Sequence, residues 1–264
     1  MEFMQVLLLT DFSENAKIMQ DYALNFFGKE DVHFILFHAM KPCKGSACEG
    51  VCSSQRHKAL TSNTEKLQQR LKPNQTLTKV FIKNNLVDAV RNYIEKNSID
   101  MIIMGGKGIT SDKNRQFGKN TYDIVTKIKC PILVIFENSV IKIPGRIVFP
   151  LDYSTSFQHK YFKTISKLNF WKTINLSILE VPNRMLNNLM FQKTNKHKIS
   201  KTFKEINYQF KPIENKGENG ICDGCLDADM IMFMAKNLSI SNQIFSQLNA
   251  KKLNQQTPLL VLHA

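Results

Sequence analysis

Residues 100–108 read DMIIMGGKG, a short apolar run that ends in a cluster of glycines. The four consecutive apolar residues at 101–104 are typical of a strand that is buried on both faces of a parallel sheet. Other strand-like segments occur at 5–10, 32–37, 76–82 and 131–136. Helix-compatible segments lie between them, at 14–27, 57–71, 86–95 and 120–129. Strands that alternate with helices in this way predict an α/β fold with a parallel sheet.

The pattern of the first half starts again in the second half. Three segments repeat in the same order: RIVFPLDYS at 146–154 matches QVLLLTDFS at 5–13, DMIMF at 229–233 matches DMIIM at 100–104, and PLLVL at 258–262 matches PILVI at 131–135. Asp152 thus corresponds to Asp11. Ordered repeats predict a tandem duplication, with copies at 1–138 and 146–264 and a linker at 139–145. Each copy is long enough to bury a core of its own.

The glycines that follow residue 104 suggest a phosphate site. Gly105 and Gly108 are separated by two residues, and Gly118 follows after nine more, at the start of a predicted helix. Glycines let backbone N–H groups approach phosphate oxygens, and a helix N-terminus adds the positive end of its dipole. Asp11 ends the first strand and is expected in the same crevice, where open α/β sheets bind nucleotides. The alternative interpretation is a glycine turn that only joins a strand to a helix.

These segments resemble the universal stress protein family. The matching stretches are VLLLTDFSENA at 6–16, FILFHAM at 34–40, SIDMIIMGGKG at 98–108 and FGKNTYDIVTKIKCPILVI at 117–135, with RIVFPLDYS, ADMIMFM and TPLLVLHA in the second copy. The resemblance implies two tandem copies of a five-stranded parallel α/β sandwich of the adenine-nucleotide-hydrolase-like type. It also implies that the copies pair as a pseudo-dimer, as single-domain members pair in homodimers.

The resemblance further implies a ligand and the residues that hold it. The ligand is ATP or AMP, with or without magnesium. Asp11 would contact the adenosine part, and Ala39 stands where the family usually has valine beside the adenine. Gly105 and Gly108 would face ribose and phosphate, and Gly118 and its successors would cradle phosphates.

Two features depart from the family pattern. Lys119 stands where the family has Ser or Thr, which removes a hydroxyl and adds a cation, although Asn120 and Thr121 still offer polar side chains. The second copy has AKNL at 235–238 in place of the glycines, so side chains there would block a phosphate. We therefore expect at most one nucleotide per chain, bound in the first copy. Asp152 is expected to cap a helix instead.

The chain has six cysteines, and five of them fall in two groups that invite a metal interpretation. The first group is Cys43, Cys48 and Cys52, with His57 nearby, and the second is Cys222 and Cys225. Thiolates and imidazoles are zinc ligands, but the spacing fits no standard zinc finger or ribbon. No metal site is therefore assigned, and labile thiols, a redox pair and incidental loop cysteines stay open as alternatives. Cys130 is expected in buried packing.

The formal net charge of +14 would suit an anionic partner. Lys and Asn are abundant throughout, however, so we interpret the charge as a compositional bias and expect no specific nucleic-acid partner. The stretch 184–204 lacks acidic residues and is either a solvated face or an anionic-partner site. No apolar run approaches the ~18 residues of a membrane span, and no secretory signal is recognisable. These features predict a cytoplasmic protein with no membrane partner.

The sequence therefore predicts a cytosolic, nucleotide-binding stress protein that acts through its conformation or through partner binding. No HExxH, GxSxG or Walker motif occurs. Catalysis is not expected beyond slow ATP hydrolysis or self-phosphorylation, since no general base is identifiable. A nucleotide-free interaction scaffold is the first alternative, with Lys119 and Ala39 as marks of a decayed pocket. A thiol or metal sensor that uses the cysteine-rich segment is the second. Further homo-oligomerisation stays open.

Overall fold

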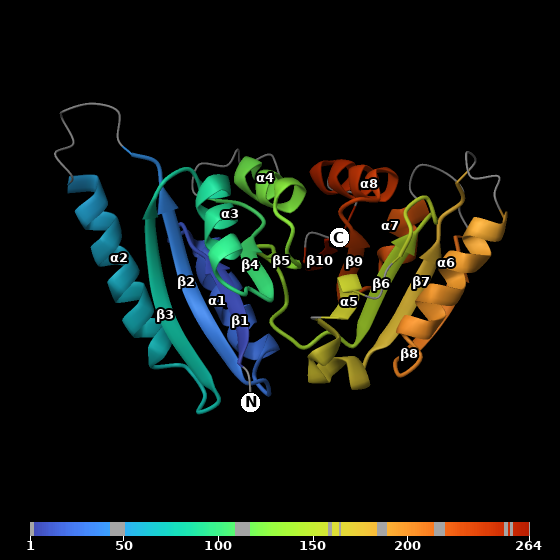
Figure 1. Cartoon of the computed structure of the whole chain (residues 1–264), viewed down its shortest axis with the longest axis horizontal. Coiled ribbons are helices and arrows are strands. Elements are labelled where there is room, and N and C mark those ends of the chain that lie inside the picture. Colours follow the sequence, from blue (N-terminus) through green and yellow to red (C-terminus); the bar gives the residue numbers. More distant parts are fainter. Residues whose placement is uncertain are drawn as a thin grey trace.

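A ten-stranded sheet runs through the whole molecule in the computed structural model (Figure 1). The structure describes residues 3–42, 51–108, 117–157, 160–163, 165–183, 189–213, 220–250, 253 and 256–263. The strands are β1 (Met4–Leu9), β2 (Val32–Met40), β3 (Gln75–Lys83), β4 (Met101–Gly105), β5 (Ile132–Ile135), β6 (Arg146–Leu151), β7 (Asn175–Glu180), β8 (Asn207–Pro212), β9 (Met230–Met234) and β10 (Leu259–Leu262). Their order in the sheet is β3-β2-β1-β4-β5-β10-β9-β6-β7-β8.

Each half of the chain contributes five neighbouring strands that are parallel to one another. The two sets meet where β5 pairs with β10 in antiparallel fashion, with Leu133 opposite Leu260. This pairing covers the last strand of each half, and an apolar parallel edge left unpaired would invite aggregation. The predicted α/β fold class with a tandem arrangement is confirmed.

Helices cover both faces of the sheet, which explains why the strands are apolar on both sides. The helices are α1 (Glu14–Phe26), α2 (Val51–Gln68), α3 (Leu86–Lys96), α4 (Lys119–Lys127), α5 (Lys160–Lys163), α6 (Leu189–Thr202), α7 (Gly220–Cys225) and α8 (Leu238–Asn249), with 3-10 turns η2 (Ile165–Lys167) and η3 (Asn169–Lys172). Helices α1, α2 and α6 pack on one face, against residues such as Leu8 and Phe149. Helices α3, α4, α7 and α8 pack on the other, against residues such as Leu7 and Phe233. None of the described helices has the length and apolar character needed to cross a bilayer.

The duplication extends to the turn that follows the first strand of each half. Phe12 and Tyr153 both adopt a positive φ, of 66° and 59°. In both turns an aspartate Oδ1 accepts a hydrogen bond of 3.0 Å from the backbone N–H two residues later. Positive φ is uncommon for a bulky residue, so two such turns at matching positions are strong evidence for one ancestral turn.

The halves differ in what comes after this turn. In the first half Ser13 caps the thirteen-residue helix α1, because its Oγ accepts from Ala16 N at 3.1 Å. In the second half residues 153–155 form bends, and in the described part of the chain only the four-residue α5 and two 3-10 turns follow before β7. The expected capping role of Asp152 is therefore wrong, since no helix begins in the described residues directly after it. An aromatic cluster that includes Phe157, Phe162 and Trp171 fills the space instead.

Candidate functional site

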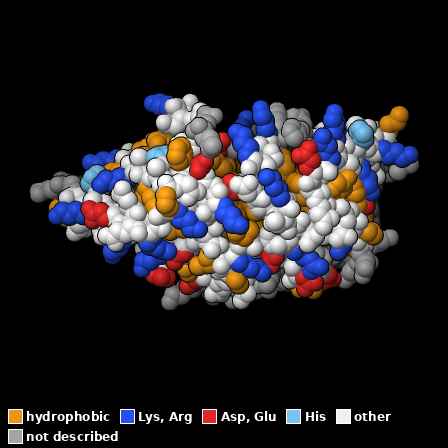
Figure 2. Space-filling view, turned by 90° about the horizontal axis from the view of Figure 1, so that it is seen from below, with side chains coloured by type: hydrophobic (Ala, Val, Ile, Leu, Met, Phe, Trp, Pro, Cys, Tyr) orange, Lys and Arg blue, Asp and Glu red, His pale blue; other side chains and the backbone are white. Residues whose placement is uncertain are grey.

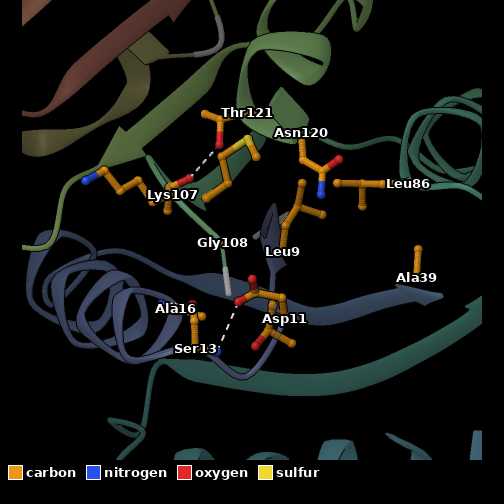
Figure 3. Close-up of a pocket in the computed structure, with 13 residues that line it drawn as sticks. Leu9, Asp11, Ser13, Ala16, Ala39, Leu86, Lys107, Gly108, Asn120 and Thr121 are labelled. Carbon is orange, nitrogen blue, oxygen red and sulfur yellow. Dashed lines mark hydrogen bonds between the residues drawn. The ribbon is translucent and has the colours of Figure 1, made fainter. Parts of the chain in front are cut away.

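A cavity of about 100 Å³ opens at the carboxyl ends of β1, β2 and β4 (Figure 3). Its walls comprise Leu9, Thr10, Asp11, Ser13, Ala16, Ala39, Leu86, Met104, Gly105, Lys107, Gly108, Asn120 and Thr121. Six of the eight residues expected to bind the nucleotide are among them. Gly118 and Lys119 do not line this cavity, because they lie at the start of α4 and Lys119 faces a neighbouring groove.

The turn after β1 holds Asp11 in the cavity. Asp11 Oδ1 accepts from Ser13 N at 3.0 Å, and Thr10 Oγ1 accepts from Phe12 N at 3.1 Å. The carboxylate points toward the glycine loop, defined as residues 105–108 (Figure 3). A β-carbon built on Gly108 would lie only 2.6 Å from Asp11 Oδ2. A side chain at position 108 would therefore displace this carboxylate, which is a steric reason for a glycine at this position.

The glycine loop is held by two side chains from other elements. Thr121 Oγ1 donates to the carbonyl of Gly105 at 2.9 Å, and Asn15 Nδ2 donates to the carbonyl of Lys107 at 3.1 Å. Asn15 is 7% exposed, and a β-carbon on Gly105 would lie 2.7 Å from its amide nitrogen. Sequence reasoning missed Asn15, although a polar residue on the buried side of a predicted helix was a signal that was available.

Helix α4 presents its N-terminus beside this loop. Gly118 is the N-cap and makes no side-chain capping bond, so the N–H groups of the first turn keep their donor capacity. Asn120 and Thr121 follow in the cavity wall (Figure 3). Donors at a helix N-terminus together with an aspartate across the cavity suit a ligand with an anionic end and a hydroxyl-bearing end.

His38 supports the Asp11 turn from the opposite face of the sheet. Its Nδ1 donates to the carbonyl of Thr10 at 2.7 Å, and its ring lies 4.5 Å from that of Phe12. Burial lowers the pKa of His38, and the nearby Arg56 lowers it further, against the raising effects of the Thr10 carbonyl and Asp11. The imidazole is therefore a neutral structural support, whereas the neighbouring residue Ala39 faces the cavity.

The corresponding position in the second half is filled by a side chain. The offset of 129 that maps Asp100 onto Asp229 also maps Gly108 onto Asn237. Asn237 Nδ2 donates to Asp152 Oδ1 at 2.7 Å, and both residues are almost completely buried, at 1% and 2% exposure. Asn183 Nδ2 donates to the other carboxylate oxygen at 3.1 Å. This is the obstruction that the missing glycines led us to expect.

The candidate metal ligands are only partly within the described chain. Cys43 and Cys48 lie outside the described residues, and Cys52 is exposed at the start of α2. Among the residues that the structure describes, no group of three or more His, Cys, Asp or Glu side chains is arranged to hold a metal ion. Cys222 and Cys225 are buried on α7, and burial raises the pKa of Cys225 to about 12. A thiol of that kind is protonated and unreactive at neutral pH, which disfavours a redox pair.

Positive charge is spread over the face of the molecule that Figure 2 shows. Figure 2 shows Lys and Arg side chains scattered across one face of the molecule, with Asp and Glu between them. In the basic stretch, Lys196 is paired with Glu180 at 2.9 Å and lies 4.2 Å from the centre of the Phe210 ring. On this face the distribution agrees with a compositional bias.

Comparisons with known proteins agree with this architecture. Residues 2–135 match the family described as the universal stress protein family. A universal stress protein from Archaeoglobus fulgidus superposes with a TM-score of 0.67 at 15% identity, covering 97% of this chain and 95% of that one. A putative universal stress protein from Pseudomonas aeruginosa gives 0.56 at 13% identity, covering 98% and 93%.

A universal stress protein solved in complex with cAMP covers 50% of this chain and 97% of its own, at 15% identity and a TM-score of 0.39. No curated protein matches the sequence. The two full-length structural matches show that the same fold spans both halves of the chain.

Proposed function

The chain belongs to the universal stress protein family, and from this premise we propose that it binds one adenine nucleotide, ATP or AMP, in the cavity of its first half. The observation that carries the proposal is the meeting of Asp11, the glycine loop and the start of α4 around one cavity. Asp11 is suited to the nucleoside part of a nucleotide, and the glycine loop and the start of α4 are suited to its phosphates.

The cavity walls indicate how the nucleotide would lie. Leu9, Ala39, Leu86 and Met104 provide an apolar surface for a base. Asp11 is a hydrogen-bond acceptor for the ribose hydroxyls or the amino group of adenine. The phosphates would lie toward Gly108 and the first turn of α4, where backbone N–H groups and the dipole favour negative charge. Magnesium would accompany ATP through the phosphates.

We propose that the protein acts in the stress response through the state that the nucleotide stabilises, by conformation or by partner binding, and not by rapid turnover. Asp11 and Lys107 are the titratable side chains among the described cavity residues, and an aspartate that already accepts a hydrogen bond from its own turn is a poor general base. The proposal includes a cytoplasmic location, where adenine nucleotides are abundant.

Titration of the nucleotide-stripped full chain tests this function directly. We expect ATP and AMP to bind with one equivalent per chain in isothermal calorimetry. The native mass of the protein before stripping should exceed the stripped mass by one nucleotide. Absence of binding to ATP, AMP and adenosine would overturn the proposal and place the nucleotide-free scaffold first.

Lys119 tests whether the pocket is adapted to phosphate. An ammonium at a helix N-terminus is unfavourable by about 0.3–1 kcal/mol, and an anion nearby offsets this cost. Replacing Lys119 by alanine should weaken ATP binding about three- to tenfold, because an exposed charge contact is partly screened. Adenosine binding should not change, and the loss should shrink at high salt.

Lys129→Ala is the matched control, since Lys129 is also exposed but lies beyond the end of α4. It should leave ATP affinity unaltered. If Lys119→Ala raises thermal stability while ATP affinity stays constant, the lysine is only a surface residue with no role toward phosphate.

A further inference from the structure

A second, larger hollow adjoins the cavity. It is a groove of about 830 Å³ between α3 and α4, and it lies within the usual size range of ligand sites. Leu86 and Asn120 line both the cavity and the groove. They lie next to each other on the α3 side of the cavity (Figure 3), so a ligand that passes between them would occupy both spaces.

The groove carries more positive than negative charge. Among the residues that the structure describes, its walls contain four cations and two carboxylates, namely Lys41, Arg91, Lys119, Lys127, Asp88 and Asp123. Each carboxylate is paired within its own helix, to Arg91 at 3.3 Å and to Lys127 at 2.6 Å. Lys41 and Lys119 form no ion pair with any part of the chain that the structure describes. Two charges are therefore left for an anionic ligand.

The groove also has surfaces that a bare phosphate chain would not use. Pro42, Leu86 and Val87 provide an apolar wall, and Asn84 adds an amide beside them. Lys119 and Asn120 start helix α4, where the phosphates of a nucleotide in the cavity would lie. Lys119 therefore stands beside Asn120 at the exit from the cavity, and Pro42, Asn84 and Val87 line the groove outside it.

We propose that this groove holds the second nucleoside of a dinucleoside polyphosphate whose first adenosine occupies the cavity. The inference rests on the proposed nucleotide function and narrows its ligand class. The phosphate chain runs past Asn120 and Lys119, and Lys41 lines the same groove. The second base then lies against Pro42 and Val87. A mononucleotide reaches no further than Lys119 and Asn120 at the exit of the cavity and leaves the rest of the groove empty.

Calorimetry with AMP, ATP and diadenosine tetraphosphate tests the proposal on the full chain. We expect diadenosine tetraphosphate to bind at least tenfold more tightly than ATP, with one ligand per chain. The double variant Lys41→Ala/Arg91→Ala should remove this advantage and leave AMP affinity unchanged, because neither side chain lines the cavity. Val87→Trp fills the groove and should have the same selective effect.

Lys96→Ala is the matched control, since Lys96 is a basic residue in the last turn of α3, outside the groove. It should preserve the advantage of the dinucleotide. Equal affinities for ATP and diadenosine tetraphosphate, with AMP still bound, would overturn this inference and leave the proposed function standing. An advantage that survives in both groove variants would also overturn it. Failure of all three ligands to bind would instead overturn the proposed function.

Discussion

Replacing Gly108 by asparagine is expected to close the cavity of the first half and to weaken nucleotide binding at least 100-fold without unfolding the protein. The second half already has the side-chain arrangement that this substitution would create. There Asn237 stands at the position of Gly108, and its Nδ2 donates to Asp152 at 2.7 Å. Asp11 has the place of Asp152 in the first half, so the introduced amide would meet the same partner in the same kind of turn.

The backbone permits this substitution. Gly108 does not have a positive φ, and the close neighbour of an added β-carbon is the carboxylate of Asp11, which is the far end of a side chain. The asparagine can therefore displace and then bond that carboxylate, which offsets the crowding. Thermal stability should stay close to that of the parent protein.

Calorimetric titration of the Gly108→Asn variant with ATP tests the expected loss of binding, and a thermal melt tests the expected retention of stability. Gly145→Asn is the matched control, because a β-carbon on Gly145 meets nothing closer than 3.5 Å and the residue lies outside the cavity. It should bind ATP as the parent does. Retention of parental affinity by Gly108→Asn would show that the nucleotide, if bound, sits elsewhere.

Replacing Asn237 by leucine is expected to destabilise the protein by about 3 kcal/mol. Asn237 caps α8, because its Oδ1 accepts from Ile240 N at 3.2 Å, and loss of an N-cap costs about 1 kcal/mol. It also donates to the buried carboxylate of Asp152, and a hydrogen bond to a charged group contributes about 1.5–3 kcal/mol. Leucine has a similar volume but supplies neither bond.

For a chain of this size the expected fall in Tm is about 6–12 °C, measurable by calorimetry or circular dichroism. Asn242→Leu makes the same chemical change on the exposed side of the same helix and should alter Tm by only a degree or two. If the two variants melt at the same temperature, the Asn237–Asp152 contact contributes no stability.

The fold could be predicted because the sequence features that indicate it lie within short stretches of the chain. Apolar runs mark the strands, and the repeated segments around Asp11 and Asp152 mark the duplication. The ends of the helices depend on weaker signals in the sequence. Helix α2 spans Val51–Gln68 where 57–71 was predicted, since a polar helix with a narrow apolar stripe has few positions that identify its ends.

The parts of the site that escaped prediction depend on contacts between distant segments. Asn15 reaches Lys107, 92 residues away, and Asn237 reaches Asp152, 85 residues away. Composition and periodicity carry no information about such pairs. Lys119 was expected beside the phosphates from its position in a motif. It lines the adjacent groove and not the cavity itself, because successive residues at a helix start point in different directions.

The bond between Asn237 and Asp152 also bears on how the chain would respond to its ligand. Asn237 occupies, in the second half, the position that corresponds to the ligand site of the first half. The second half is therefore always in a filled state, whether or not nucleotide is present. On the proposed function, one site per chain is left to fill, and the chain has no second site with which it could cooperate. Within one chain, occupancy would then follow a simple hyperbola, and a single chain would respond to nucleotide concentration in a graded way without a threshold.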